Sequence, residues 1–301
     1  MASAEDILSK PHVYSWSTKV DFVLNSVGGF KGVNVDSIRV PWQESLILTL
    51  EKRAIHPNLE AAGDTSYRFT LEATETACEA EEIGKRLACA LLKISIDKNW
   101  GLRLAWPDTP LPCRVIDRTA SPGLSLQSFG SVTNHLLLSD FASALQGVFR
   151  RLLKVPYRLL LSMELCASSR FETDNRTKLV VLVSALEALA EQQEFGSEVD
   201  ELINSLVPLV TSSAIKDESI KNSILGQVRG LKRESCRRAI KRKLHEVGIS
   251  SQELALVEEA YGARSKVVHE GRRVPELDFM NASIDSLIKK IYTYEIELCS
   301  Q

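Results

Sequence analysis

The sequence lacks the motifs of the common metal-dependent and nucleotide-dependent enzymes. Its six cysteines are widely scattered and no Cys-x-x-Cys occurs, so neither a zinc ribbon nor a disulfide framework is expected. It also contains no His-Glu-x-x-His, no Gly-rich phosphate-binding loop of either common pattern and no Gly-x-Ser-x-Gly. We therefore expect no metal site and no cofactor.

Long hydrophobic runs are also missing. The longest nearly apolar run, residues 179–190, contains Ser184 and Glu187 and is too short to span a bilayer. Residues 1–10 hold two early acids and no apolar core, unlike a secretory signal. Together with the scattered cysteines, these features predict a cytoplasmic protein with no membrane-embedded part.

The 301 residues predict two domains at roughly 150 residues each. A hydrophobic content of 44% and a charged content of 25% are typical of a globular protein with a buried core. Residues 45–53 and 66–73 read as strands, and Thr76 with Glu79 forms a capping box at the start of a helix. Residues 101–106 and 113–117 are further strand candidates. We expect an α+β module over residues 1–130, with a sensor or regulatory role and a linker at 119–131.

From residue 135 to 301 the periodicity predicts an all-α domain. The expected helices cover residues 136–154, 157–168, 175–193, 198–212 with an interruption at Pro208, a segment opened by Asp217, 231–247, a segment from Ser250 or Ser251 to Tyr261, and 279–298. The helix at 175–193 is apolar on nearly all sides, which favours the centre of the domain.

Charge is distributed unevenly. The net charge is −2, yet residues 229–245 hold eight Lys or Arg and one acid. A helix over 231–247 would carry two basic ridges, and we expect both to contact phosphates. The first ridge is Arg233, Arg237 and Lys241, and the second is Arg238 and Arg242. No aromatic residue lies among them, so we expect backbone contacts rather than base stacking. Alternatively, this face is solvated or pairs with acids elsewhere in the chain.

Arg264 and His269 form an Arg-x4-His motif near the C-terminus. A histidine transfers protons near neutral pH, and an arginine stabilises the extra charge of a phosphorane, so the pair is sufficient to cut RNA. Five residues place them about 140° apart on a straight helix. Convergence needs a distortion near Gly262 or a second copy across a symmetric dimer. Alternatively, His269 ends the helix structurally and Arg264 pairs with Glu258 or Glu259.

Glu187 is a carboxylate in an otherwise apolar helix, and a buried charge needs a partner. It is a candidate site residue that orients Arg264 or His269. The alternative is that it lies on the exposed stripe of its helix.

Two strings, SALEALAE at 184–191 and ARSKVVHEG at 263–271, lie in this order within the helical segment. In this arrangement, residues 136–300 resemble the HEPN superfamily, and are most similar to its ApeA-like group. The resemblance implies a helical bundle that forms a homodimer and places two Arg-x4–6-His motifs in one cleft.

The resemblance further implies a metal-independent endoribonuclease, acting as an antiviral defence or toxin effector. The RNA 2′-OH would attack the adjacent phosphate, with His269 transferring protons and Arg264 clamping the phosphate. Lys266, inside the motif, joins the basic helix as an RNA contact. Ser265 departs from the pattern, where Asn, Asp or His commonly follows the arginine. This departure favours an alternative, a non-catalytic dimerisation module that binds RNA or protein, or one held by an antitoxin or regulatory protein.

Overall fold

The computed structural model describes residues 16–25, 30–31, 37–42, 46–53, 64–74, 76–104, 113–117, 136–272 and 274–300. The strands are β1 (Trp16–Leu24), β2 (Phe30–Lys31), β3 (Ser37–Trp42), β4 (Leu46–Arg53), β5 (Thr65–Thr74), β6 (Leu102–Leu104), β7 (Arg114–Asp117) and β8 (Leu136–Leu137). The helices are α2 (Ala77–Asp97), α3 (Leu138–Arg151), α4 (Tyr157–Ser168), the 3-10 turn η2 (Ser169–Phe171), α5 (Asn175–Leu189), α6 (Ser197–Thr211), α7 (Glu218–Gly230), α8 (Cys236–Glu246), α9 (Ser251–Glu270) and α10 (Leu277–Leu298).

The N-terminal part is an antiparallel sheet in the order β3-β4-β5-β1-β6, with β7 also pairing with β1. Alternating side chains of β1, β4 and β5 form one apolar face, since Val20 lies opposite Phe69 and Leu48 lies opposite Leu71. Phe22 stacks on Phe69 with ring centroids 5.6 Å apart. This face supplies the sheet's share of the hydrophobic core.

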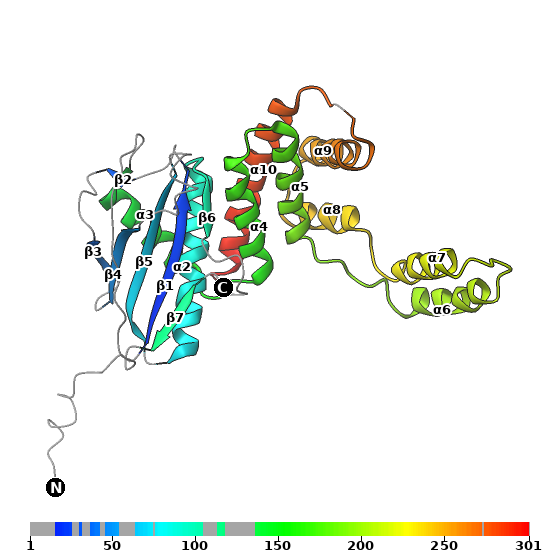
Figure 1. The fold of residues 1–301 in the computed structure, drawn as a ribbon, viewed down its shortest axis with the longest axis horizontal. Coiled ribbons are helices and arrows are strands. Elements are labelled where there is room, and N and C mark those ends of the chain that lie inside the picture. The colour runs from blue at the N-terminus through cyan, green and yellow to red at the C-terminus, as the bar shows by residue number, and fades with distance from the viewer. Residues whose placement is uncertain are drawn as a thin grey trace, which may run out of the picture.

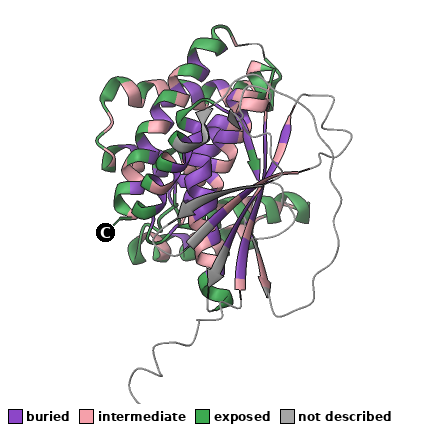
Figure 2. Ribbon diagram, turned by 90° about the vertical axis from the view of Figure 1, so that its left-hand side faces the viewer, coloured by how far each residue is buried: buried purple, intermediate pink, exposed green. Residues whose placement is uncertain are grey.

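Helix α2 lies between the sheet and the helical bundle (Figure 1). Thr76 caps its start by accepting a hydrogen bond from the Glu79 N–H. The helix contacts β1 and β5 on one side and α4 and α10 on the other. Buried residues concentrate on the strands and on the helices packed beside them (Figure 2). The sheet, α2 and the bundle thus share one continuous hydrophobic core.

Helix α5 occupies the centre of the bundle and contacts α4, α8, α9 and α10, as its apolar sequence predicts. A buried polar contact joins α5 to α4 and α10. The Ser162 hydroxyl donates to the Ala185 carbonyl at 2.6 Å, and its oxygen lies 2.8 Å from the Tyr292 hydroxyl. Both polar side chains are therefore satisfied inside the apolar bundle.

Helices α6 and α7 form a hairpin that projects from the bundle (Figure 1). Within the described part of the chain, Ile203 is the one buried residue of α6, and α7 has none. The two ends of the hairpin are joined where they leave the bundle. The Phe195 N–H donates to the Lys232 carbonyl at 3.0 Å, and the Glu234 N–H donates to the Gln193 carbonyl at 2.9 Å.

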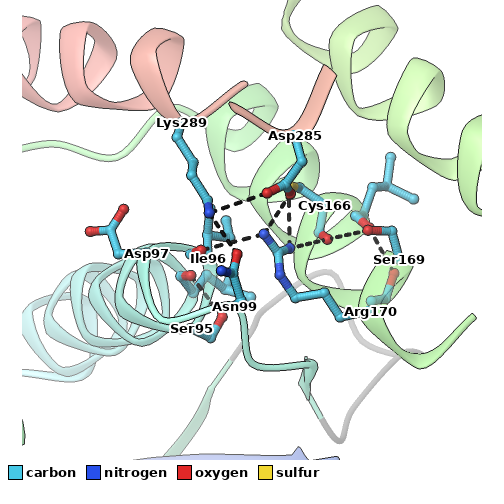
Figure 3. A network of polar contacts seen from close by, with 12 residues as sticks. Ser95, Ile96, Asp97, Asn99, Cys166, Ser169, Arg170, Asp285 and Lys289 are labelled. Carbon is cyan, nitrogen blue, oxygen red and sulfur yellow. Dashed lines mark hydrogen bonds and ion pairs between the residues drawn. The ribbon is translucent and has the colours of Figure 1, made fainter. Parts of the chain in front are cut away.

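Arg170 joins the sheet module to the bundle (Figure 3). Its guanidinium lies 2.6 Å from Asp285 on α10 and donates to the Ile96 carbonyl of α2. The side chains of Arg170 and Asp285 are only 7% and 19% exposed. Lys289, also on α10, reaches Asn99 after the end of α2 at 2.6 Å. These charged contacts fix α10 against the C-terminal end of α2.

Gly101 shows how closely the two modules approach at this point. A Cβ atom there would lie 2.7 Å from Asn25 of the sheet module and 2.9 Å from the Phe171 ring. Asn25 donates to the Arg170 carbonyl across the same contact. Only glycine fits at this position without displacing its neighbours.

An antiparallel sheet followed by helices confirms the predicted fold class at the level of α+β and then helical. The strands expected at 45–53, 66–73, 101–106 and 113–117 and the helix capped by Thr76 are all present. The predicted linker and the boundary between 130 and 135 lie outside the described residues. Among the helices the structure describes, none has the length and apolar character needed to cross a membrane.

The helices differ from the predicted ones at several points. Residues 231–235 are not helical, because this segment makes the backbone contacts that join the ends of the hairpin, and α8 begins only after the Ser235 cap. The same contacts end α5 at Leu189, before the predicted limit of 193. Helix α6 continues through Pro208 to Thr211 without interruption.

The Arg170–Asp285 pair makes a stability prediction. Asp285→Ala leaves an almost fully buried guanidinium without its carboxylate, so we expect a loss of about 3 kcal/mol in the free energy of unfolding. Urea denaturation followed by circular dichroism measures the change. The matched control is Arg272→Ala, which breaks an exposed pair with Glu270 and is expected to cost less than about 1 kcal/mol. Equal losses for the two variants would contradict the role of Arg170.

Candidate functional site

Helix α9 carries the whole Arg-x4-His motif in one unbroken helix. Ser250 and Glu253 form a complete capping box at its start, and Lys290 of α10 pairs with Glu253. These contacts, the Lys290 hydrogen bond first, lower the pKa of Glu253 to about 2. The helix ends at Gly271, whose φ of 63° is left-handed. It therefore extends well beyond the predicted limit of Tyr261.

The continuity of α9 excludes one of the two arrangements that could bring Arg264 and His269 to one point. Gly262 lies inside the helix without breaking it, so the predicted option of a distortion between Arg264 and His269 is wrong for a single copy. The two residues lie about 140° apart around the axis and about 7.5 Å apart along it. Arg264 faces α5, and His269 is exposed on the last turn. One chain alone does not bring them to one point.

Arg264 lies beside Glu187. Its Nη2 atom is 3.7 Å from the Glu187 Oε2 atom, and both side chains are 23% exposed. That distance is an ion pair but is too long for a hydrogen bond. Within the described residues, the buried Nε atom of Arg264 has no hydrogen-bond acceptor. Glu187 thus holds the guanidinium in position but does not use all of its hydrogen-bond donors. The alternative partner Glu258 instead pairs with Arg237 and Lys241 of α8.

Cys236 and Tyr261 complete this cluster, and the sequence analysis missed both. Burial raises the pKa of the Cys236 thiol, the nearby Glu187 charge raises it further, and Arg264 opposes the shift. Burial and then Glu187 raise the pKa of the Tyr261 hydroxyl. Four polar groups from α5, α8 and α9 therefore interact in one partly buried cluster. Tyr261 lies three residues before Arg264, a spacing that places two residues on one helix face and could have identified it.

Ion pairs within the chain engage the basic residues around α8. Arg233 pairs with Glu194 at 3.2 Å, and it lies before α8 rather than on the predicted helical ridge. Arg242 pairs with Glu234 at 2.7 Å and with Glu246 at 3.0 Å. Arg237 and Lys241 share Glu258, and Arg238 lies 4.0 Å from Glu234. Acids close by in the bundle therefore neutralise much of the basic block.

Lys266 is exposed one turn from His269 and lines a groove between α9 and α10. It lies apart from the residues of α8 with which it was grouped as an RNA contact. Within the described ranges, no group of three or more His, Cys, Asp or Glu side chains is arranged to hold a metal ion.

The chain was compared with protein-family models, with curated proteins and with solved structures, and no match was found in any of the three.

The Glu187–Arg264–Cys236 cluster predicts opposite changes in thiol reactivity. Glu187→Gln removes a negative charge, so the pKa of Cys236 falls and alkylation at pH 8 becomes faster. Arg264→Gln removes the opposing positive charge, so that pKa rises and alkylation slows. Mass spectrometry of iodoacetamide-labelled peptides measures both rates, with exposed Cys78 as the internal reference. Changes of the same sign in both variants would contradict the arrangement.

Proposed function

We propose that this chain is a HEPN-like, metal-independent endoribonuclease that acts as a homodimer. In this proposal the RNA 2′-OH attacks the adjacent phosphorus, the new P–O2′ bond forms and the P–O5′ bond breaks. The products are a 2′,3′-cyclic phosphate and a 5′-OH end. His269 accepts the 2′-OH proton, the departing O5′ atom takes up a proton from water, and Arg264 stabilises the charge of the phosphorane.

The observation that carries the proposal is the state of the Arg264 guanidinium. An arginine with a purely structural role normally uses its donors in hydrogen bonds, as Arg170 does with Asp285. Arg264 has one ion pair at 3.7 Å and an unsatisfied buried Nε atom. Glu187 holds this group in place, and the donors that remain for a phosphate oxygen are Nη atoms, because the Nε atom is buried and out of reach of a ligand.

The angle between Arg264 and His269 supports the homodimer. Because α9 is continuous, the two side chains point in different directions, and a common phosphate needs residues from two copies. A two-fold axis close to the C-terminal turns of α9 would bring Arg264 of one copy toward His269 of the other. RNA is the proposed partner, and an antitoxin or regulatory protein would restrain the activity in a defence or toxin role.

A second candidate function is a non-catalytic HEPN-like module that binds RNA or a protein. Ser265 at the position after the arginine favours it, and so do the ion pairs that engage the basic residues of α8. Both candidates use the same dimer and differ in whether phosphodiester bonds are cut.

Cleavage is tested with total RNA and tRNA in EDTA, followed by end-group analysis. Wild type is expected to give cyclic-phosphate ends, and Arg264→Ala and His269→Ala are each expected to reduce the rate at least about 100-fold. The matched control is Arg150→Ala, which removes an exposed arginine on α3, distant in sequence from Arg264, and is expected to leave the rate unchanged. Cleavage retained by His269→Ala would refute the proposal. RNA binding without cyclic-phosphate ends would select the second candidate.

Mixing the two inactive variants tests the composite site. If Arg264 of one copy acts with His269 of the other, a heterodimer of Arg264→Ala and His269→Ala contains one intact site. Random pairing then restores about a quarter of the wild-type rate. No recovery after subunit exchange would contradict a site shared between copies, and so would a monomer in light scattering at micromolar concentration.

A further inference from the structure

A groove lies beside the basic helix, at the point where the α6–α7 hairpin leaves the bundle. Its volume is about 400 Å³, within the range of ligand pockets. The lining residues come from the segment after α5 and from α8: Gln193, Glu194, Phe195, Glu234, Arg238, Lys241, Arg242 and His245. It is therefore separate from the Arg264–Glu187 cluster.

The aromatic ring of Phe195 lies in this groove, although the sequence placed no aromatic residue within the basic helix. The Phe195 side chain is brought there from the segment after α5, and the Arg238 guanidinium lies over its ring at 5.1 Å from the centroid. The residue remains 42% exposed. An exposed aromatic ring beside an arginine is a surface on which a planar base can stack.

The backbone that carries Phe195 is fixed. Its N–H donates to the Lys232 carbonyl at 3.0 Å, and Glu194 and Arg233 form an antiparallel bridge. The almost fully buried Glu234 carboxylate accepts hydrogen bonds from the Gln193 N–H and from Arg242. Hydrogen bonds thus fix the backbone on both sides of the ring, so binding costs little additional conformational entropy in this segment.

One cation beside the groove is best placed for an anion. Residues 191–195 and 232–246 contain seven Lys or Arg and four Glu, and Asp200 and Glu295 also pair with Lys232 and Lys243, so ion pairs offset most of the positive charge. Glu258 of α9 neutralises part of it through Arg237 and Lys241. Arg238 has the weakest pair, at 4.0 Å from Glu234, and its side chain is largely exposed. Its guanidinium can therefore contact a phosphate while it lies over the ring.

We infer that this groove binds single-stranded nucleic acid, with one unpaired base stacked on Phe195 and a neighbouring phosphate held by Arg238. A base inside a duplex cannot reach the ring, so the groove selects single strands. The choice of RNA as the natural polymer rests on the proposed function. The groove thus adds a stacking site to the backbone contacts that the sequence predicts.

The test uses fluorescence anisotropy with a 5′-labelled 12-nucleotide single strand of DNA, which lacks the 2′-OH and cannot be cleaved by the proposed chemistry. Phe195→Ala is expected to weaken binding about tenfold, and Phe195→Trp to retain it. The matched control is Phe279→Ala on α10, which removes another exposed phenyl ring, 71% exposed, and leaves affinity unchanged. The corresponding duplex is expected to bind more weakly than the single strand and to be unaffected by Phe195→Ala.

Salt dependence tests the phosphate contact separately. Arg238→Gln removes one cation, so the slope of log K against log salt becomes shallower by about 0.7. Equal affinities of wild type and Phe195→Ala would overturn the stacking site, and so would equal losses in Phe195→Ala and Phe279→Ala. Competition by a poly-glutamate peptide that equals competition by unlabelled DNA would assign the groove to acidic peptides instead.

These outcomes are independent of cleavage. Loss of DNA binding in Phe195→Ala, together with no RNA cleavage by wild type, would uphold the groove and refute the endoribonuclease. Cleavage that depends on His269, together with DNA binding that ignores Phe195, would do the reverse.

Discussion

The ion pair between Arg170 and Asp285 sets the position of everything that follows it in the bundle. Because both groups are largely removed from water, they are stable only in mutual contact, and that contact also satisfies the end of α2. It fixes α10 against the sheet module. Lys290, five residues further along α10, then pairs with Glu253 in the capping box that starts α9. Because that pair is partly exposed, the position of Arg264 against α5 depends mainly on the packing of α9 against α5 and α10, with Val257, Ala260 and Ala263 buried.

Electrostatics around α8 are more local than the sequence implies. The net charge of residues 229–245 describes a strongly basic segment, but the fold places glutamates from the end of α5, the segment before α8, and α9 beside it. A count over this segment includes Glu234 but misses Glu194 and Glu258, which come from other parts of the sequence. The charges remaining for a ligand are those whose partners are distant or shared, and Arg238 is the clearest example.

The sequence predicted the features that depend on periodicity and capping. The central position of α5 follows from its apolar composition, and the start of α2 from Thr76. β1, the strand that pairs with β5, β6 and β7, was not among the predicted strands, although Lys19 and Asp21 alternate with the apolar Val20 and Phe22. Asp21 is accommodated by a 2.5 Å pair with Arg68 of β5, a contact across 47 residues that no local pattern contains.

At the candidate site, the Arg-x4-His motif and Glu187 could be selected from the sequence, and the structure brings Glu187 and Arg264 together. The positions of Cys236 in this cluster and of Phe195 in the groove beside α8 could not be predicted from the sequence. Their positions depend on the backbone contacts between residues 193–195 and 232–234, which join segments about 40 residues apart. Such contacts form only after the intervening hairpin has folded back on itself.

The backbone contacts between residues 193–195 and 232–234 make the α6–α7 hairpin an insertion whose two ends lie side by side. Its two ends meet in a short backbone ladder, and its helices contribute one buried residue in the described part of the chain. An insertion with adjacent ends can be lengthened, shortened or exchanged while the host core keeps its packing. The segment between Gly196 and Leu231 can therefore accept changes of sequence and length, whereas α5, α8 and α9 are constrained by their contacts with one another.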